Sequence, residues 1–229
     1  MAAGLAHDFN NLLAAVLGNA AIVRRSLDAE SAVMSHARQI ETITREAVDL
    51  ANEMLLYSGR GTIDLKRFNL AQTIRRMKRV LEGMAPRGVK IRVQAEAGRL
   101  PIEGDEDLVR RAIVNLVENG CEALADRNGS VTVKVETVSL GPSDVQDFVL
   151  ADHFVDGRYI RIQVSDTGCG MPRRIRDRMF EPFFSTKIRG RGMGLTTVLG
   201  AVRAHRGAVN VVTAPRKGAT VTLLLPAAT

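Results

Sequence analysis

The chain has 229 residues, of which 45% are hydrophobic and 25% charged, the proportions of an ordinary globular protein. This composition excludes bulk disorder, and no apolar run reaches the roughly 20 residues of a membrane span. Two cysteines, Cys121 and Cys169, cannot build a disulfide framework. We therefore expect a cytoplasmic protein that makes no membrane contact through this segment.

The charge is basic: 32 Lys and Arg against 25 Asp and Glu give a net +7. Such an excess suits nucleic acid, a membrane surface or a phosphate-rich ligand. Aromatic residues are only 4% of the chain and Trp is absent, so a stacking platform for single-stranded nucleic acid is poorly supplied. We therefore expect no nucleic-acid partner.

The first sixty residues predict two helices of about 25 residues each, separated near Leu27–Ser31, where Asp28 and Ser31 are candidate caps. Apolar side chains recur there at spacings of three, four and seven: Leu5, Phe9, Leu12, Val16, Ala20, Val23, then Val33, Ile40, Ile43, Ala47, Leu50, Met54. A two-helix hairpin on its own leaves half of this apolar surface exposed to water. We therefore expect a homodimer whose two hairpins form a four-helix bundle.

Residues 57–62 contain two glycines and read as a linker, so we place a boundary between domains 1–62 and 63–229. Beyond it, period-two patterns predict strands at 89–93, 131–135, 159–164, 208–212 and 219–225. Helical patterns at 70–81, 106–124 and 195–205 alternate irregularly with these strands. The order favours a two-layer α/β sandwich, with 139–157 as a hairpin insertion to which we assign no chemistry.

His7 is the first candidate for chemistry. At about 100° per residue it lies about 200° from Leu5 and Phe9, so it points away from the apolar stripe. Asp8 lies beside it and Asn11 follows one turn later on the same face. An acid can take a proton from imidazole and an amide can orient a water, although a solvated helix face is the simpler interpretation of an isolated histidine.

A second candidate set follows the linker. Asn115 and Asn119 share one face of the helix predicted at 106–124, and carboxamide oxygens suit Mg²⁺. Asp166 follows a strand and precedes Gly168 and Gly170, an arrangement that lets a planar ligand approach a carboxylate that accepts from an amine. A tight turn is the alternative.

Two further stretches could bind phosphate. Gly190, Gly192 and Gly194 precede Leu195 at a predicted helix start, where exposed backbone N–H groups make an anion cradle. No strand precedes this run, so the dinucleotide-binding fingerprint does not fit. The segment 180–187 carries phenylalanines that could anchor a mobile loop and Lys187, which could reach phosphate. Alternatively, the phenylalanines of this segment form a small hydrophobic cluster without a binding role.

The order of these motifs resembles the sensor histidine kinases of two-component systems. Five segments carry the resemblance, which covers nearly the whole chain: 6–13 (the phosphoacceptor box), 115–123 (the asparagine box), 166–171 and 190–195 (the two glycine boxes) and 180–184 (the phenylalanine box). The closing residues 218–223 resemble the family's final strand. The sequence around His7 is most similar to that of hybrid kinases, which often carry a receiver domain downstream.

The resemblance implies a dimerisation and histidine-phosphotransfer hairpin followed by a GHKL-type ATP-binding domain that uses ATP and Mg²⁺. His7 would be the phosphoacceptor, Asp8 its base, and Asn11 the residue that orients water when a partner is dephosphorylated. The partner would be the receiver domain of a response regulator, phosphorylated on an aspartate. The nucleotide-binding set implied by the resemblance is Asn115, Asn119 (with Mg²⁺), Asp166, Gly168, Gly170, Phe183, Lys187, Gly190, Gly192, Gly194, Leu195 and Thr220.

One departure bears on the reaction. ATP-hydrolysing relatives of this fold carry Glu four residues before the metal-binding Asn, and this chain has Asn115 there. The departure favours phosphoryl transfer over hydrolysis. The His box begins almost at Met1, so we expect an excised catalytic core. Two alternatives stay open: a phosphotransfer or phosphatase module without productive ATP use, and a basic nucleic-acid-binding protein. His36, His153 and His205 lack a companion acid or amide, and we expect surface or core roles for them. We expect Cys169 to be a small space-filling residue, with redox sensitivity as the alternative.

Overall fold

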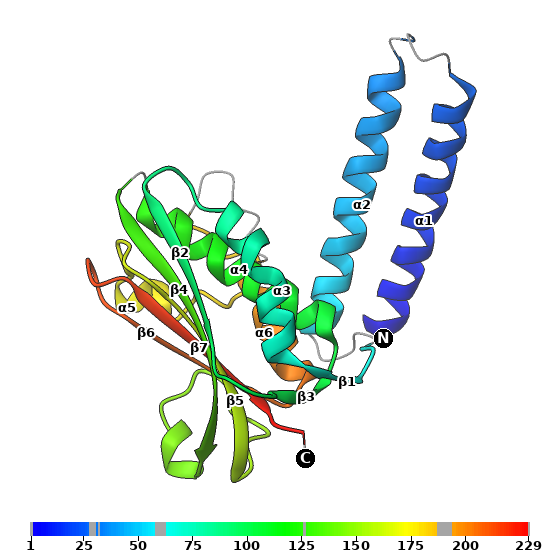
Figure 1. Ribbon diagram of the computed structural model, residues 1–229. Coiled ribbons are helices and arrows are strands. Elements are labelled where there is room, and N and C mark those ends of the chain that lie inside the picture. Colours follow the sequence, from blue (N-terminus) through cyan, green and yellow to red (C-terminus); the bar gives the residue numbers. More distant parts are fainter. Residues whose placement is uncertain are drawn as a thin grey trace. The chain divides into compact units, whose positions relative to one another are not determined.

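The computed structural model describes residues 2–27, 31, 33–57, 63–125, 127–186 and 194–228, without the side chains of 2–11, 46, 49, 50 and 52–57. The chain divides into two compact units, Met1–Gly61 and Thr62–Thr229 (Figure 1). The first unit is helical and the second combines helices with a sheet.

The first unit is an antiparallel pair of long helices, α1 (Ala2–Ser26) and α2 (Val33–Tyr57). The predicted cap Ser31 accepts a hydrogen bond from Val33 N–H at 3.3 Å, and Asp28, the other candidate, lies outside the described residues. Small residues such as Ala20 and Ala37 are buried between the helices. Glu41 is buried there too and accepts from Arg24 Nε at 2.8 Å, which ties α2 to α1.

Apolar side chains remain on the outside of this hairpin. Leu12, Val16 and Val23 follow helical spacing on α1, and Val33, Ile40 and Ile43 do so on α2; all are exposed. No helix within the described ranges is long and apolar enough to cross a membrane.

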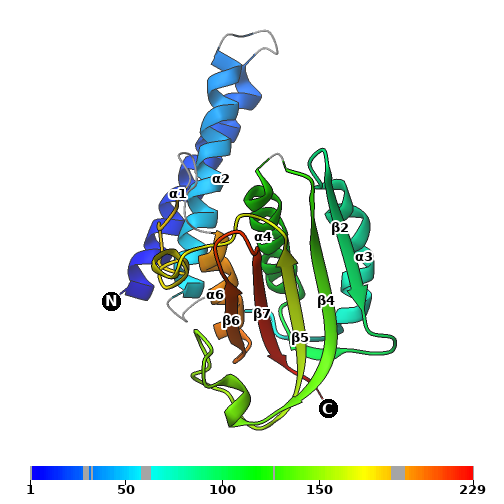
Figure 2. The same ribbon diagram turned by 90° about the vertical axis from the view of Figure 1, so that its left-hand side faces the viewer.

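The second unit is a two-layer α/β sandwich, which confirms the predicted fold class (Figures 1 and 2). Helices α3, α4 and α6 cover one face of a five-stranded sheet of order β2-β4-β5-β7-β6. The β2–β4 pair is parallel and the other pairs are antiparallel. The elements are α3 (Leu70–Gly83), β2 (Val89–Ala95), α4 (Glu106–Leu124), β4 (Gly129–Leu140), β5 (Gly157–Asp166), α6 (Gly194–Ala204), β6 (Ala208–Thr213) and β7 (Ala219–Pro226).

Four short elements have no counterpart in the sequence prediction: β1 (Lys66–Asn69), β3 (Pro101–Gly104), the 3₁₀ helix η1 (Pro142–Val145) and α5 (Arg173–Arg176). Strands β1 and β3 pair with each other in a separate small sheet. Asn69 anchors it, because its Oδ1 accepts from Ala71 N–H at the start of α3 and from Leu100 N–H before β3.

Alternation along the central strand β5 separates core from surface. Ile160, Ile162 and Val164 are buried, whereas Arg161 and Gln163 between them are only half-buried and point to the other face. Residues 141–156 fold over one end of that second face, as the expected insertion. Tyr159 is buried there in a small cluster with Val145, Ala208 and Leu224.

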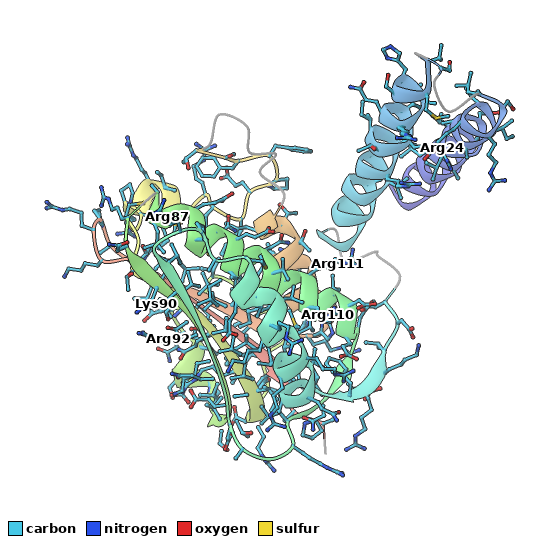
Figure 3. The ribbon with its side chains drawn as sticks, turned by 45° about the horizontal axis from the view of Figure 1, so that its top comes forward. Arg24, Arg87, Lys90, Arg92, Arg110 and Arg111 are labelled. Atoms are coloured by element: carbon cyan, nitrogen blue, oxygen red, sulfur yellow. The ribbon has the colours of Figure 1, made fainter. Side chains whose placement is uncertain are left out.

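Strand β2 forms one edge of the sheet and carries exposed basic residues, Lys90 and Arg92, with Arg87 just before it (Figure 3). Charged side chains on an edge strand oppose pairing with another chain. We assign Lys90 and Arg92 this protective role.

Ile162 lies in the middle of the core, so its truncation tests the packing of the sheet against the helices. We expect Ile162→Ala to lower the free energy of unfolding by about 2–5 kcal/mol, because it leaves a cavity under α4. Urea denaturation of the full chain measures this. The control, Val212→Ala, removes a side chain that is 66% exposed on β6 and should cost well under 1 kcal/mol. Equal losses for the two variants would contradict this core assignment.

Candidate active site

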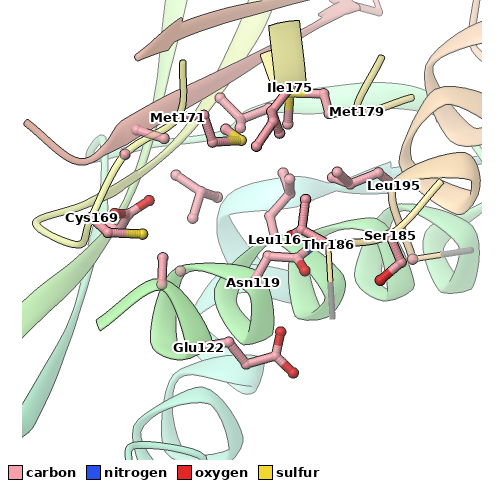
Figure 4. A pocket seen from close by; sticks show the side chains of 18 of the residues that line it. Leu116, Asn119, Glu122, Cys169, Met171, Ile175, Met179, Ser185, Thr186 and Leu195 are labelled. Atoms are coloured by element: carbon pink, nitrogen blue, oxygen red, sulfur yellow. The ribbon is translucent and has the colours of Figure 1, made fainter. Parts of the chain in front are cut away.

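A cavity of about 570 Å³ opens between α4, the end of β5, the segment around α5 and the start of α6 (Figure 4). Its volume is in the range of small-molecule sites. Most of its lining is apolar, with Asn119, Glu122, Asp166, Ser185 and Thr186 as polar exceptions. The lining is Leu116, Asn119, Gly120, Glu122, Ala123, Val164, Asp166, Cys169, Gly170, Met171, Ile175, Met179, Phe184, Ser185, Thr186, Gly194, Leu195, Ala219 and Val221.

Asp166 ends β5 and supplies a carboxylate to this apolar cavity. Its Oδ1 accepts from Gly168 N–H at 2.8 Å, and the backbone N–H of Ala219 also donates to the carboxylate. Burial raises the pKa of Asp166 above its ordinary value, and the two backbone hydrogen bonds oppose this rise. The carboxylate is therefore fixed in place, in surroundings where an amine donor on a ligand would be a strong partner.

The loop after Asp166 needs its glycines to pack against the protein itself. A Cβ on Gly168 would lie 2.5 Å from the carbonyl oxygen of Ala123 at the end of α4. Gly170 has φ +61°, and a Cβ there would lie 2.0 Å from the carbonyl oxygen of Ala214. Gly170 lines the cavity, whereas Gly168 does not. Gly168 thus serves the approach of the loop to α4 rather than direct approach of a ligand.

Of the two predicted asparagines, the structure brings one to the cavity. Asn119 lines it from the C-terminal half of α4. Asn115, one turn earlier, is not among the lining residues; its side chain lies beside the first residue of α6, with its Oδ1 3.5 Å from the position of a Cβ built on Gly194. Asn115 therefore stands where α4 meets the start of α6.

Two predicted ligands lie elsewhere than expected. Phe183 is 57% exposed with φ +64°, and the neighbouring Phe184 lines the cavity instead, with the Arg178 guanidinium 4.4 Å from its ring centroid. Thr220 points to the opposite face of the sheet, where its hydroxyl lies 2.9 Å from Ser165 Oγ. Because side chains alternate along β7, its neighbours Ala219 and Val221 reach the cavity.

The remaining predicted residues divide in two. Gly194 and Leu195 line the cavity from the start of α6. Lys187, Gly190 and Gly192 lie outside the described residues. His7, Asp8 and Asn11 lie on α1, which the structure describes as backbone only at these positions.

Several lining residues escaped the sequence analysis. Leu116 and Ala123 share the α4 face of Asn119, and their spacing of three and four from it was a usable signal. Met171 and Met179 had no signal, because they come from irregular segments. Cys169, expected to be a small space-filling residue, is exposed at the cavity.

The chemistry of the cavity suits a planar ligand that carries an exocyclic amine, as an adenine base does. An apolar slot suits a planar base, and the fixed Asp166 carboxylate suits an exocyclic amine. Among the residues that the structure describes, no three His, Cys, Asp or Glu side chains gather into a metal site. A metal ion held there would depend on ligand phosphates and on amide oxygens such as that of Asn119.

Curated relatives match the chain over nearly all of its length. The sensor kinase CckA of Brucella abortus is 25% identical over 228 residues, 99% of this chain and 24% of that protein. The sensor histidine kinase ZraS of Klebsiella oxytoca is 28% identical over 231 residues, 99% of this chain and 45% of that protein. The chain thus spans from just under a quarter to just under half of these relatives' length.

Solved structures agree in fold. The crystal structure of full-length ShkA in complex with AMPPNP matches all of this chain and 46% of its own, with a TM-score of 0.72 and 24% identity. The mycobacterial sensor histidine kinase MprB matches 72% of this chain and 98% of its own, with a TM-score of 0.56 and 21% identity. At these identities the likeness concerns the fold.

These relatives confirm the resemblance to sensor histidine kinases. The prediction that the chain is an enzyme of the protein-histidine kinase class agrees with the names of these relatives. A family model, "Histidine kinase-, DNA gyrase B-, and HSP90-like ATPase", matches residues 104–229, more than half of the chain and all of the cavity. The chain therefore belongs to the histidine kinase-, DNA gyrase B- and HSP90-like ATPase family.

Proposed function

We propose that the chain is the catalytic core of an ATP-dependent protein-histidine kinase that phosphorylates His7 and passes the phosphoryl group to an aspartate of a response-regulator receiver domain. One observation carries the proposal: within a family of ATPases, the cavity joins a fixed carboxylate, Asp166, to a carboxamide, Asn119, across an apolar slot. The units Met1–Gly61 and Thr62–Thr229 would be the phosphotransfer and ATP-binding domains.

In this proposal Asp166 accepts a hydrogen bond from the adenine amine, and Leu116 and Met179 lie among the apolar side chains around the base. Asn119 supplies an amide oxygen to Mg²⁺, and Asn115 fixes the start of α6 at the phosphate end. A bound Mg²⁺ would neutralise charge on the phosphates. Lys187, Gly190 and Gly192 would belong to the segment that covers the phosphates.

The transfer step follows from the residues on α1. An imidazole nitrogen of His7 attacks the γ-phosphorus, the bond to the bridging oxygen breaks, and ADP leaves. Asp8 accepts the imidazole proton, which keeps the nucleophile's lone pair available. Transfer is favoured over hydrolysis because Asn115 stands where hydrolysing relatives of this fold carry Glu, and Glu118 is exposed.

A second activity, phosphatase action on the regulator, is supported by a relative's name. The "Sensory histidine kinase/phosphatase NtrB" of Azospirillum brasilense is 24% identical over 220 residues, 95% of this chain and 53% of that protein. We propose that Asn11 orients the water in this reaction, as an amide one helical turn from His7.

Removing the Asp166 carboxylate tests the nucleotide site. We expect Asp166→Ala to weaken binding of Mg²⁺–ATP by roughly 10- to 150-fold, because this is the loss of affinity that corresponds to the free energy of one charged hydrogen bond. Isothermal titration measures this. Asp144→Ala is the control, because Asp144 caps the remote insertion by accepting from Gly141 N–H, and it should leave the affinity unchanged. ATP affinity of Asp166→Ala equal to that of the parent would refute the adenine assignment.

Three variants of α1 separate the phosphotransfer roles. We expect His7→Gln to abolish autophosphorylation and spare ATP binding, because its site lies on the other unit from the cavity. Asp8→Asn should slow autophosphorylation by roughly 10²–10⁴-fold through loss of the base. Asn11→Ala should keep autophosphorylation and impair dephosphorylation of the regulator. Radiolabel that resists alkali and is lost in acid identifies phosphohistidine, and parental label on His7→Gln would overturn the assignment.

The exposed apolar stripes of the hairpin support dimerisation through a second copy. We expect the full chain to be a dimer at tens of micromolar by light scattering. Replacing Val16 and Ile43 by Lys should give monomers, because both side chains are exposed and lie on the two stripes. Val80→Lys changes an apolar residue on α3 that is more exposed than either of these, and it should leave the dimer intact. A compact parental monomer would contradict the proposal.

A further inference from the structure

His205 is a buried histidine that the proposed function does not use. It directly follows α6, and its ring makes two hydrogen bonds in opposite directions. Nε2 accepts from Asp105 N–H at 2.9 Å, and Nδ1 lies 2.7 Å from the carbonyl oxygen of Ala201, one turn back on α6. Because Asp105 N–H can only donate, Nε2 must be unprotonated, so Nδ1 carries the hydrogen and donates to Ala201. The ring is therefore neutral.

The partner of this histidine is the start of α4. Asp105 is the N-cap of α4, and its Oδ1 accepts from Leu108 N–H at 2.9 Å. The preceding residue, Gly104, lies against the ring: a Cβ there would be 2.2 Å from both Cδ2 and Nε2 of His205. The imidazole thus fills the space between the end of α6 and the first turn of α4.

The two ends of this helix pair are held differently. Helices α4 and α6 pack against each other. His205 joins the start of α4 to the end of α6, whereas Asn115 meets Gly194 where α6 begins. The cavity takes residues from the second end, among them Asn119 and Leu195. The histidine therefore holds the two cavity walls from a distance: about three helical turns, roughly 15 Å, separate His205 from Leu195 along α6, and about four turns, roughly 21 Å, separate Asp105 from Asn119 along α4.

We propose that His205 is a positioning residue for the nucleotide cavity: its neutral ring latches α4 to α6, and protonation of Nε2 opens the latch. Protonation puts a hydrogen on Nε2, so a donor then faces the donor Asp105 N–H and the hydrogen bond is lost. The helix pair loses its remote tie, and the walls that carry Asn119 and Leu195 lose their fixed spacing. This inference rests on the proposed nucleotide site.

The surroundings of the ring set the direction of its titration. Burial lowers the pKa of His205 below its ordinary value, opposed by the hydrogen bond to Ala201 and by the Asp105 carboxylate. Of the other charged residues on adjoining elements, Glu103 and Arg206 are exposed and Glu106 is half-buried. The unfolded ring takes up a proton first, so His205 costs the fold no stability above about pH 6.5 and lowers stability as the pH falls below it.

The test compares the pH dependence of nucleotide affinity in the full chain, between about pH 5 and pH 8, with a non-hydrolysable ATP analogue and Mg²⁺. His205→Gln keeps an acceptor for Asp105 N–H and cannot titrate. We expect its affinity to be within about 3-fold of the parent at pH 8, and the parent to lose about 3- to 10-fold relative to it on acidification. Asp166 is present in both proteins, so the comparison between them isolates the contribution of His205. His153→Gln, at an exposed position, should follow the parent.

A second variant changes Gly104, the residue that packs against the His205 ring. Gly104→Ala should displace the parental ring and weaken the affinity about 3- to 10-fold at pH 8, and should cost little when His205 is already Ala. Gly141→Ala is the matched control, because the nearest atom to its Cβ is 3.9 Å away. Parallel pH profiles for the parent and His205→Gln, or additive losses for Gly104→Ala and His205→Ala, would overturn the proposal.

Amide hydrogen exchange gives a readout that does not need nucleotide. Exchange at Asp105 N–H should accelerate on acidification, relative to an intrinsic reference, in the parent and not in His205→Gln. If the parent binds no nucleotide at pH 8, the proposed function fails while this exchange still decides the latch. If nucleotide binds and the exchange of Asp105 is the same in both proteins, the latch alone fails.

Discussion

The cavity depends on one backbone hydrogen bond, from Cys169 N–H to the carbonyl oxygen of Ala123 at 2.9 Å. It joins the loop after β5 to the last turn of α4, where a carbonyl would otherwise lack a helical partner. Gly168 permits this approach because any side chain there would meet the same carbonyl. The consequence is that the carboxylate of Asp166 and the amide of Asn119 are held by one continuous backbone framework.

The same loop is fixed from its other side by the turn between β6 and β7. Gly218 N–H donates to Gly168 O at 3.1 Å, and the Thr213 hydroxyl accepts from Met171 N–H and donates to Gly218 O. A buried acid whose pKa is raised by burial would relax toward water in a loose loop. These ties keep it in the cavity. The buried carboxylate destabilises the ligand-free fold. In return for this cost in stability, a strong hydrogen-bond acceptor stands at a fixed point before any ligand binds, as in other preorganised sites.

The sequence was sufficient to predict elements with a repeating pattern of apolar residues. It was not sufficient where a shift of one residue along a strand decides which face a side chain occupies. Alternation was sufficient for β5 and β7, yet Thr220 and Val221 differ by one residue and lie on opposite faces. Strands β1 and β3 have four residues each, too few for a pattern to be visible. The shared helical face of Asn115 and Asn119 was correct in spacing, but only the tertiary packing of α6 decides that Asn115 meets Gly194. His205 carried no local signal at all, because its partner is one hundred residues away in the chain.

The order of the strands has a consequence for how the second unit forms. Strand β7 follows the other strands of this sheet in the sequence, yet it lies inside the sheet, between β5 and β6. Until residues 219–226 leave the ribosome, β5 and β6 have no common neighbour, and the buried faces of Ile162 and Val209 stay open to water. The sheet of this unit can therefore be completed only after β7 has been synthesised, because its pairing with β5 joins residues about 60 positions apart. Until then the edges of β5 and β6 that face β7 lack their partner, and unpaired strand edges of this kind promote misassociation.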